Sequence, residues 1–168
     1  MTPGVADDGT FEKIGIPATL LTAYLDQRGI EVEKTTDFTI LFLFSIGVTK
    51  GKYGTLINGL LHFKEDYDAN APLAEVLKSI VELAPQRYSG MGLRDLGDEM
   101  FAQIKESNLL KWQADAFSSL PTPSITPAET YSKLVHNDIE LVPVNQMAHR
   151  VLATGIVPYP PGIPMLMP

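Results

Sequence analysis

The 168-residue sequence contains no cysteine, and this absence excludes several classes of protein. Disulfide scaffolds, cysteine-based zinc sites and thiol nucleophiles are ruled out. A chain without cysteine also fits a reducing compartment. No apolar run reaches the roughly 18 residues of a membrane-spanning helix, and the N-terminal MTPGVADDG lacks the basic and apolar parts of a signal peptide. We therefore expect a cytoplasmic protein with no membrane partner.

Positive charge is also scarce. The chain has 13 lysines and arginines against 20 aspartates and glutamates, which gives a formal net charge of −7. Because nucleic-acid binding requires a basic surface, we expect no nucleic-acid partner. Apolar residues make up 45% of the sequence, which is ordinary for a globular protein that buries a core.

Familiar catalytic motifs are missing as well. Serines 45, 118, 119 and 124 lack a GxSxG setting. His62, His136 and His149 do not pair at metal-ligand spacing, so structural or surface roles are favoured over metal binding. Motifs therefore predict no catalytic residue, no metal site and no cofactor-binding residue.

The stretch GVTKGK, residues 47–52, lies where a phosphate-binding loop would lie, between a predicted strand and a predicted helix. It has three residues between its glycines where a Walker loop has four, and Tyr53 follows Lys52 in place of serine or threonine. A strand-to-helix turn with solvated lysines is the favoured interpretation. Anion binding at the helix N-terminus is the alternative.

The apolar pattern predicts an α+β fold in the first part of the chain. The first predicted helix has Pro17 in its first turn and ends just before Gly29. Alternation predicts a half-buried strand over Ile30–Lys34, and the dense apolar run Phe38–Ile46 predicts a strand covered on both faces. Helical spacing then continues from Tyr53 to Tyr67, so that residues 16–67 are predicted as helix, strand, strand, helix.

Beyond a break at Asp68–Pro72, the sequence predicts mainly helices separated by prolines. Thr126, Pro127 and Glu129 form a capping box that starts one of them. The other elements expected in this part are a helix from Leu73 to Val81 ending near Pro85, helices around 96–104 and 108–120, a strand Ile139–Val142 and a short helix Asn145–Leu152. We place a domain boundary near residues 68–72.

Two groups of carboxylates are candidates for chemistry. Asp95, Asp98 and Glu99 cluster on one predicted helix, where a solvated acidic face is favoured over catalysis. A second group flanks the two adjacent strands and consists of Glu31, Glu33 and Asp37. Carboxylates near a strand end can face a cationic ligand, although solvation is favoured on the residues alone.

The chain ends on VPYPPGIPMLMP, residues 157–168, in which five of twelve residues are proline. Proline excludes a helix and makes the segment a stiff, extended, apolar strip that needs a surface to lie on. An ordinary C-terminus is frayed and polar, so we expect this one to be cut off within a motif.

Three strings resemble the C-terminal third of the bacterial Orn/Lys/Arg decarboxylases, which are large pyridoxal-phosphate-dependent enzymes of the aminotransferase fold. They are GIPATLLTAYLDQRGIEVEKT (15–35), TTDFTILFLFSIGVTKGKYGTLINGLLHFKEDYDANAPL (35–73) and HRVLATGIVPYPPGIPMLMP (149–168). TTDF and DANAPL resemble arginine decarboxylases, whereas VEKT resembles lysine or ornithine members, so the substrate stays open among the three. The similarity covers essentially the whole chain and is weakest over residues 75–124.

The resemblance implies a fold in two parts. Residues 1–70 are expected to form part of a small aminotransferase-type subdomain, a mostly antiparallel sheet with helices on it. Residues 71–168 are expected to form a partial, mainly helical C-terminal domain with short strands. The chain is then a C-terminal piece or a truncated product that lacks the Schiff-base lysine, is inactive alone, and does not bind the coenzyme covalently through Lys50, Lys52 or any other lysine.

The resemblance also implies a function. The complete enzyme would decarboxylate arginine, lysine or ornithine as a homodimer or higher homo-oligomer, in polyamine metabolism or acid resistance, with pyridoxal phosphate as electron sink. An acidic residue of the VEKTTDF stretch would bind the distal cationic group of the substrate, with Glu33 the first candidate and Asp37 the second. The alternative is a non-catalytic module for oligomerisation or regulatory binding, because its apolar segments need partners.

Overall fold

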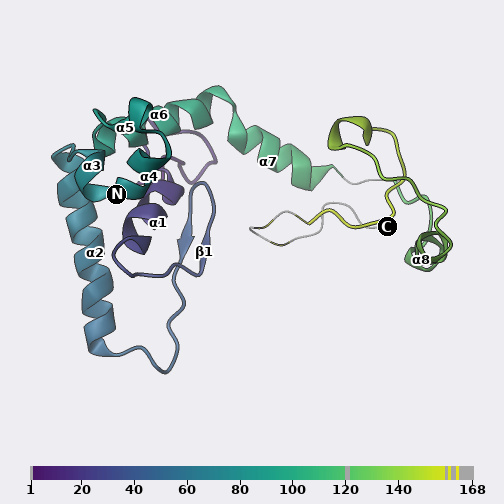
Figure 1. Cartoon of the computed structure of the whole chain (residues 1–168), viewed down its shortest axis with the longest axis horizontal. Coiled ribbons are helices and arrows are strands. Elements are labelled where there is room, and N and C mark those ends of the chain that lie inside the picture. The colour runs from purple at the N-terminus through teal and green to yellow at the C-terminus, as the bar shows by residue number, and fades with distance from the viewer. Residues whose placement is uncertain (1, 120–121, 158, 160–161, 163–168) are drawn as a thin grey trace. The chain divides into compact units, whose positions relative to one another are not determined.

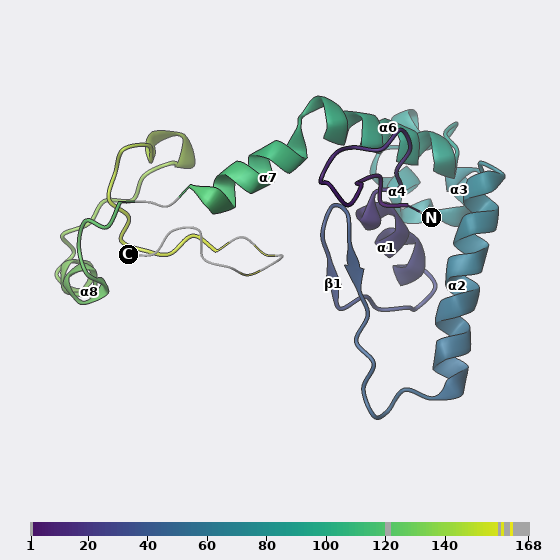
Figure 2. The ribbon, with the colours of Figure 1, turned by 180° about the vertical axis from the view of Figure 1, so that it is seen from behind.

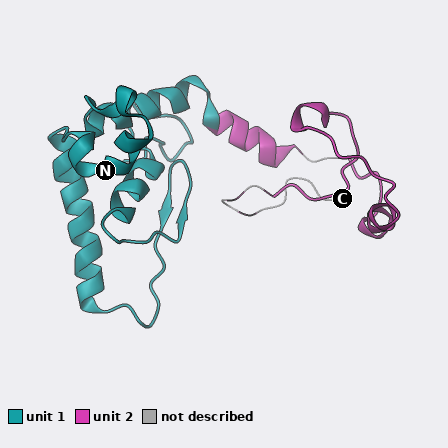
Figure 3. Ribbon diagram, viewed as in Figure 1, with its two compact units in different colours: residues 1–109 teal, residues 110–168 magenta. Residues whose placement is uncertain are grey.

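The computed structural model describes residues 2–119, 122–157, 159 and 162 and divides the chain into two compact units, residues 1–109 and 110–168 (Figure 3). The units contain helices and a small antiparallel sheet, which confirms the predicted α+β class. Most of the proline-rich C-terminal strip, including Pro158, Pro160 and Pro161, lies outside the described residues.

Unit 1 contains most of the regular structure (Figure 1). Its elements in chain order are α1 (Ala18–Asp26), β1 (Lys34–Thr35), β2 (Ile40–Leu41), α2 (Lys50–Asp68), α3 (Leu73–Val76), α4 (Lys78–Leu83), α5 (Pro85–Tyr88) and α6 (Leu93–Glu106). The order helix, strand, strand, helix predicted for the first part is confirmed. The helix α7 (Leu109–Ser118) follows, and unit 2 also contains α8 (Pro127–Val135) and the 3₁₀ turn η1 (Val144–Gln146).

The core of unit 1 is formed where α1, α2 and α6 meet. Tyr24 of α1 and Phe63 of α2 are fully buried and meet edge to face, with ring centroids 5.0 Å apart. Tyr67 stacks on Phe63 from one turn further along α2. Leu93 and Leu96 bring α6 into the same cluster. As Figures 1 and 2 show, α1 lies between α2 and the β1–β2 hairpin, so this core fixes the hairpin to the helices.

The N-terminal loop packs on α6 through two glycines. A β-carbon at Gly4 would lie 2.4 Å from the ring of Phe101, and one at Gly15 would lie 2.6 Å from the same ring. The two glycine backbones also touch one another, which only residues without a side chain permit. Phe11 meets the edge of the same ring at a centroid distance of 6.0 Å.

The predicted strands are the main point at which the structure differs from the sequence interpretation. Within Ile30–Lys34 only Lys34 belongs to a strand, and the run Phe38–Ile46 contributes only Ile40 and Leu41 to one. The prediction that this run is covered on both faces is wrong for the chain as described, because Leu43 is 69% exposed and Ile46 is fully exposed. The two-stranded ribbon is short and contacts α1 through β1, and the exposed residues of the apolar run lie beyond it.

Other boundaries also shift, each for a local reason. The single helix expected from Leu73 to Val81 is split at Leu77, which leaves helical geometry (φ −142°, ψ 56°) and buries its side chain completely. Pro85 begins a helix as well as following one. In unit 2 the capping box of Thr126 and Glu129 is confirmed. The strand Ile139–Val142 does not form, and the helix expected over residues 145–152 is reduced to η1.

The domain boundary that we predict near residues 68–72 remains a prediction, because it concerns the domains of the complete family members. In this structure those residues join α2 to α3 within unit 1. Among the described helices, none is both long enough and apolar enough to cross a membrane.

Two glycines of α2 provide a test of this packing. Gly54 has open space around its missing side chain, whereas a β-carbon at Gly59 would lie 2.6 Å from Ile30 and 3.1 Å from Leu25. We expect Gly54→Ala to raise the free energy of unfolding by about 1 kcal/mol through helix propensity alone. Gly59→Ala should gain less or lose stability because its neighbours must move. Urea denaturation followed by circular dichroism measures both, and an equal gain at the two positions would contradict the packing described.

Candidate functional site

The hairpin built on β1 and β2 carries the two candidate substrate carboxylates. Lys34 pairs with Leu41 and Thr35 pairs with Ile40, and the amide of Glu33 extends the ladder by donating to the carbonyl of Leu41 at 3.1 Å. The side chain of Glu33 is exposed at the base of the hairpin. The alternation that predicted this orientation therefore holds, although the residue precedes the strand.

Asp37 lies at the other end of β1, in the turn. Threonines close this turn, since the hydroxyl of Thr36 accepts from the amide of Thr39 at 2.9 Å. The carbonyl of Asp37 accepts from the amide of Ala18 at 3.0 Å, at the N-terminus of α1, and its side chain is half-buried. Through its backbone Asp37 supports the start of α1, whereas the backbone of Glu33 supports the ladder.

Two contacts position the hairpin on α1. One is the bond from Ala18 to Asp37, and the other joins the hydroxyls of Thr22 and Thr35, which lie 2.7 Å apart. The hairpin therefore presents Glu33 from a fixed base rather than from a free loop. A carboxylate in this setting can accept a charge-assisted hydrogen bond from an amine or a guanidinium.

The GVTKGK stretch forms the turn into α2, as favoured by the sequence. Thr49 is the N-cap, and Lys50 and Lys52 are exposed in the first turn of the helix. The histidines are dispersed. His62 is exposed on α2, His149 is exposed with φ 63°, and Nδ1 of His136 lies 2.7 Å from the carbonyl oxygen of Ser132. No set of three or more acidic or histidine side chains is placed to hold a metal ion in the part of the chain that the structure describes.

The acidic cluster on α6 is largely exposed, which agrees with the expected solvated face, and its members also have partners. Asp95 accepts from the amide of Gly92 at 3.1 Å and from the side chain of Asn70 at 2.9 Å. These bonds lower the pKa of the Asp95 carboxyl, with the bond from Asn70 the larger cause. The same Asn70, whose φ of 52° ends α2, accepts from the amides of Arg94 and Asp95 and so caps α6.

The other two acidic residues of this cluster also hold α6 in place. Asp98 accepts from the hydroxyl of Tyr67 at 3.1 Å, and Glu99 pairs with Arg87. Burial, followed by the charge of Asp98, raises the pKa of Tyr67 to about 12. These contacts give the cluster a structural role in unit 1.

Sequence reasoning missed a polar cluster between α1 and α2. The buried Tyr24 donates to Asp66, and the guanidinium of Arg28 lies 3.4 Å above the Tyr24 ring and 3.6 Å from the Asp66 carboxylate. Burial and the bond to Asp66 raise the pKa of Tyr24. Spacing of four residues relates Tyr24 to Arg28, but Asp66 is 42 residues away and no local signal identifies it.

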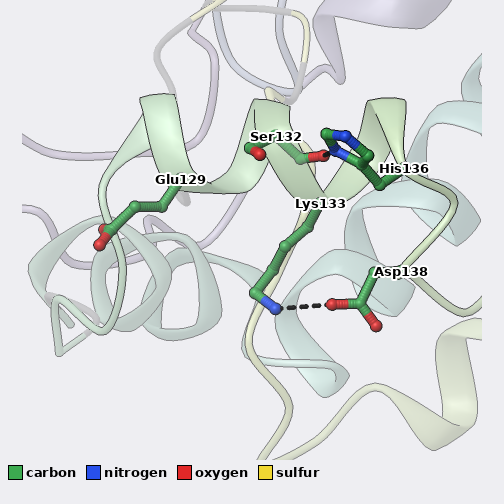
Figure 4. Close-up of a pocket in the computed structure, with 5 residues that line it drawn as sticks. All are labelled: Glu129, Ser132, Lys133, His136 and Asp138. Atoms are coloured by element: carbon green, nitrogen blue, oxygen red, sulfur yellow. Dashed lines mark hydrogen bonds and ion pairs between the residues drawn. The ribbon is translucent and has the colours of Figure 1, made fainter.

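A surface hollow of about 360 Å³ lies beside α8 in unit 2 (Figure 4). Five side chains line it: Glu129, Ser132, Lys133, His136 and Asp138. Lys133 pairs with Asp138 at 2.8 Å and lowers the pKa of that carboxyl, while Glu129 bonds the amide of Thr126 in the capping box. Glu129, Lys133 and His136 are therefore engaged with partners in α8 or next to it.

The chain is similar to proteins of one family along nearly its whole length. The model of the Orn/Lys/Arg decarboxylase major domain matches residues 1–52, and that of the Orn/Lys/Arg decarboxylase C-terminal domain matches residues 110–168. The biodegradative arginine decarboxylase of Escherichia coli is 50% identical over 99% of this chain and 22% of its own length. Lysine decarboxylase LdcA of Pseudomonas aeruginosa is 44% identical over 99% of this chain and 22% of its own length.

Solved structures agree. The constitutive lysine decarboxylase of E. coli matches with a TM-score of 0.95 at 38% identity, over 99% of this chain and 24% of that one. The lysine decarboxylase of Francisella novicida matches with a TM-score of 0.92 at 33% identity, over all of this chain and 23% of that one. The chain thus spans about a quarter of the length of the relatives that it matches.

The bonds of Asp95 predict a pH dependence of stability. Because the carboxyl pKa is lower in the folded chain than its ordinary value of 3.8, the group contributes stability above that value and loses it as the pH falls through the folded-state pKa. We expect Asp95→Asn to destabilise the chain at pH 6 and to differ less from the wild type at pH 2.5. Urea denaturation over this range measures the difference. Asp7→Asn, at an exposed loop position, is the control, and wild-type and Asp95→Asn curves that stay parallel would contradict the assignment.

Proposed function

Because the chain belongs to the Orn/Lys/Arg decarboxylase family, we propose that it is part of an enzyme that converts a basic amino acid into the corresponding amine and CO2. The observation that carries this proposal is 50% identity over 99% of the chain to an arginine decarboxylase. Arginine is accordingly the first substrate to test, followed by lysine and ornithine. A homodimer or higher homo-oligomer in the cytoplasm is part of the same proposal.

Pyridoxal phosphate is the coenzyme that this proposal implies, and it supplies an electron sink for the bonding pair released when CO2 departs. The exposed lysines of α2, α7 and α8 do not fit the role of its covalent anchor. Lys50 and Lys52 are exposed in the first turn of α2. Three others are exposed and paired with aspartates: Lys64, Lys111 and Lys133. We therefore assign the anchoring lysine to polypeptide outside this chain, and we assign no chemical step through the coenzyme to these residues.

The contribution proposed for this chain is recognition of the distal cation of the substrate. Glu33 is the first candidate because its side chain is exposed while its backbone is held in the hairpin. Asp37 is the second candidate because its backbone already caps α1 and its side chain is half-buried. A carboxylate that loses water against an ammonium or guanidinium group forms a hydrogen bond about twice as strong as a neutral one. Paired donors of a guanidinium would favour arginine.

A binding or assembly module is the second candidate function. The observation in its favour is the number of large apolar side chains left exposed, including Leu43, Ile46, Trp112 and Leu141. Such a module would be encoded without the rest of a decarboxylase. A decarboxylase in which it replaced the matching segment would release no CO2.

A full-length polypeptide in which this chain replaces the matching segment of the E. coli arginine decarboxylase provides the test. We expect CO2 release from arginine, lysine or ornithine, and we expect Glu33→Gln to lower kcat/KM by one to two orders of magnitude, about 1.4–3 kcal/mol. Glu31→Gln, the same charge change two residues away, should stay within about twofold. An unchanged value for Glu33→Gln would move the role to Asp37, which Asp37→Asn then tests. No CO2 from any of the three substrates would overturn the proposed function.

A further inference from the structure

Thr22 of α1 and Thr35 of β1 bring their hydroxyl groups within 2.7 Å of one another, and both residues are half-buried. Either hydroxyl can donate, so each threonine supplies the hydrogen-bond partner that the other needs in this partly enclosed place. Two heavy atoms on each β-carbon restrict the rotation of both side chains and so limit where each hydroxyl can lie. The pair is therefore a directional link between the helix and the hairpin.

This link lies close to Glu33 along the chain. Thr35 follows Glu33 by two residues, and Lys34 between them pairs with Leu41 in the ladder. The amide of Glu33 donates to the carbonyl of Leu41 as well, so the ladder stiffens the backbone from residue 33 to residue 35. Because two residues of extended chain span only roughly 7 Å, a displacement of Thr35 is transmitted to Glu33.

Other contacts hold the two ends of this segment. Ile30 and Val32, before Glu33, are partly buried apolar residues that pack against the core, and apolar burial is non-directional. The carbonyl of Asp37 accepts from the amide of Ala18 at 3.0 Å, but Asp37 lies beyond β1, in the turn. A directional contact two residues from Glu33 therefore controls the orientation of that residue more closely than these attachments do.

We propose that Thr22 is a positioning residue for Glu33 and, through Glu33, helps to set which basic amino acid the complete enzyme prefers. The inference rests on the proposed function, in which the Glu33 carboxylate binds the distal cation of the substrate. Ornithine and lysine differ by one methylene, and arginine presents the paired donors of a guanidinium. A carboxylate held at a fixed place distinguishes these substrates by their reach, so its displacement changes their ranking as well as the rate.

The competing interpretation is that the threonine pair only stabilises unit 1. Its loss would then lower the amount of folded enzyme and reduce the rate with every substrate by the same factor. It would also have the same effect whether or not Glu33 is present, because the two residues would contribute independently. The two interpretations therefore differ in ratios that can be measured.

A double-mutant cycle tests the proposal in the full-length chimera, in which this chain replaces the matching segment of the E. coli arginine decarboxylase. Thr22→Val removes the hydroxyl and keeps the shape of the side chain. We expect it to lower kcat/KM about fivefold for the best substrate and to change the ratio of kcat/KM between substrates about threefold. In the Glu33→Gln background the same change should cost less than about twofold, because the group that Thr22 positions is already lost. Equal losses in the two backgrounds, or an equal loss for every substrate, would overturn the proposal.

Two control variants separate the hydroxyl from other changes at this helix. Thr22→Ser keeps the hydroxyl and should stay within about twofold of the wild type. Thr19→Val makes the same substitution at an exposed position of α1 and should also stay within about twofold. A loss in Thr22→Ser as large as that in Thr22→Val would show that the hydroxyl is not the group responsible, and would overturn the proposal.

Hydrogen exchange followed by mass spectrometry measures the same link without any measurement of activity. In Thr22→Val the hairpin peptide, whose ladder includes the amides of Glu33 and Thr36, should exchange about threefold faster. The peptide of α2 that contains Phe63 should stay within about twofold, since Phe63 lies in the core. Equal acceleration in the two peptides, or none in the hairpin, would overturn the proposal.

The outcomes distinguish this inference from the proposed function. No CO2 from arginine, lysine or ornithine would overturn the proposed function. CO2 release that Glu33→Gln slows, with an independent effect of Thr22→Val, would count against the inference alone. An unchanged kcat/KM in Glu33→Gln would overturn the inference as well, because Thr22 would then have no substrate carboxylate to position.

Discussion

Burial of Tyr24 between α1 and α2 is the constraint on which the rest of unit 1 depends. Its ring meets Phe63 edge to face, and its hydroxyl needs Asp66 because a buried hydroxyl without a partner is costly. These contacts fix α1 against α2, and α1 in turn holds the hairpin through Ala18 and Thr22. The position of the candidate carboxylates, Glu33 and Asp37, therefore depends on the packing of α1 against α2.

The sequence predicts those features that residues close in the chain decide. The helical spacing from Tyr53 to Tyr67 and the capping box at Thr126 both involve neighbours within a few positions, and both are found. The break at Leu77 and the capping of α6 by Asn70 depend on packing between separate elements. The spacing of apolar residues does not indicate such contacts. It therefore predicts a single helix over Leu73–Val81, where the chain forms α3 and α4.

The candidate site divides in the same way. Alternation correctly places Glu33 outward, whereas the backbone role of Asp37 at the start of α1 depends on a tertiary contact. Residues alone leave Glu33 as one solvated carboxylate among many, and only the resemblance to a family distinguishes it. A substrate site shared between segments of polypeptide leaves little signature in any one of them, because each supplies a single group.

The contact of Gly4 and Gly15 with the ring of Phe101 has a consequence for how this protein can be divided. Residues 2–15 have almost no regular structure, yet they cover one side of an aromatic ring in α6. A shortened version that begins at α1 would leave that ring open to water and loosen the helix that carries it. The loop therefore covers part of the core. A shortened version of this chain that keeps α6 must also keep the loop in its place on Phe101.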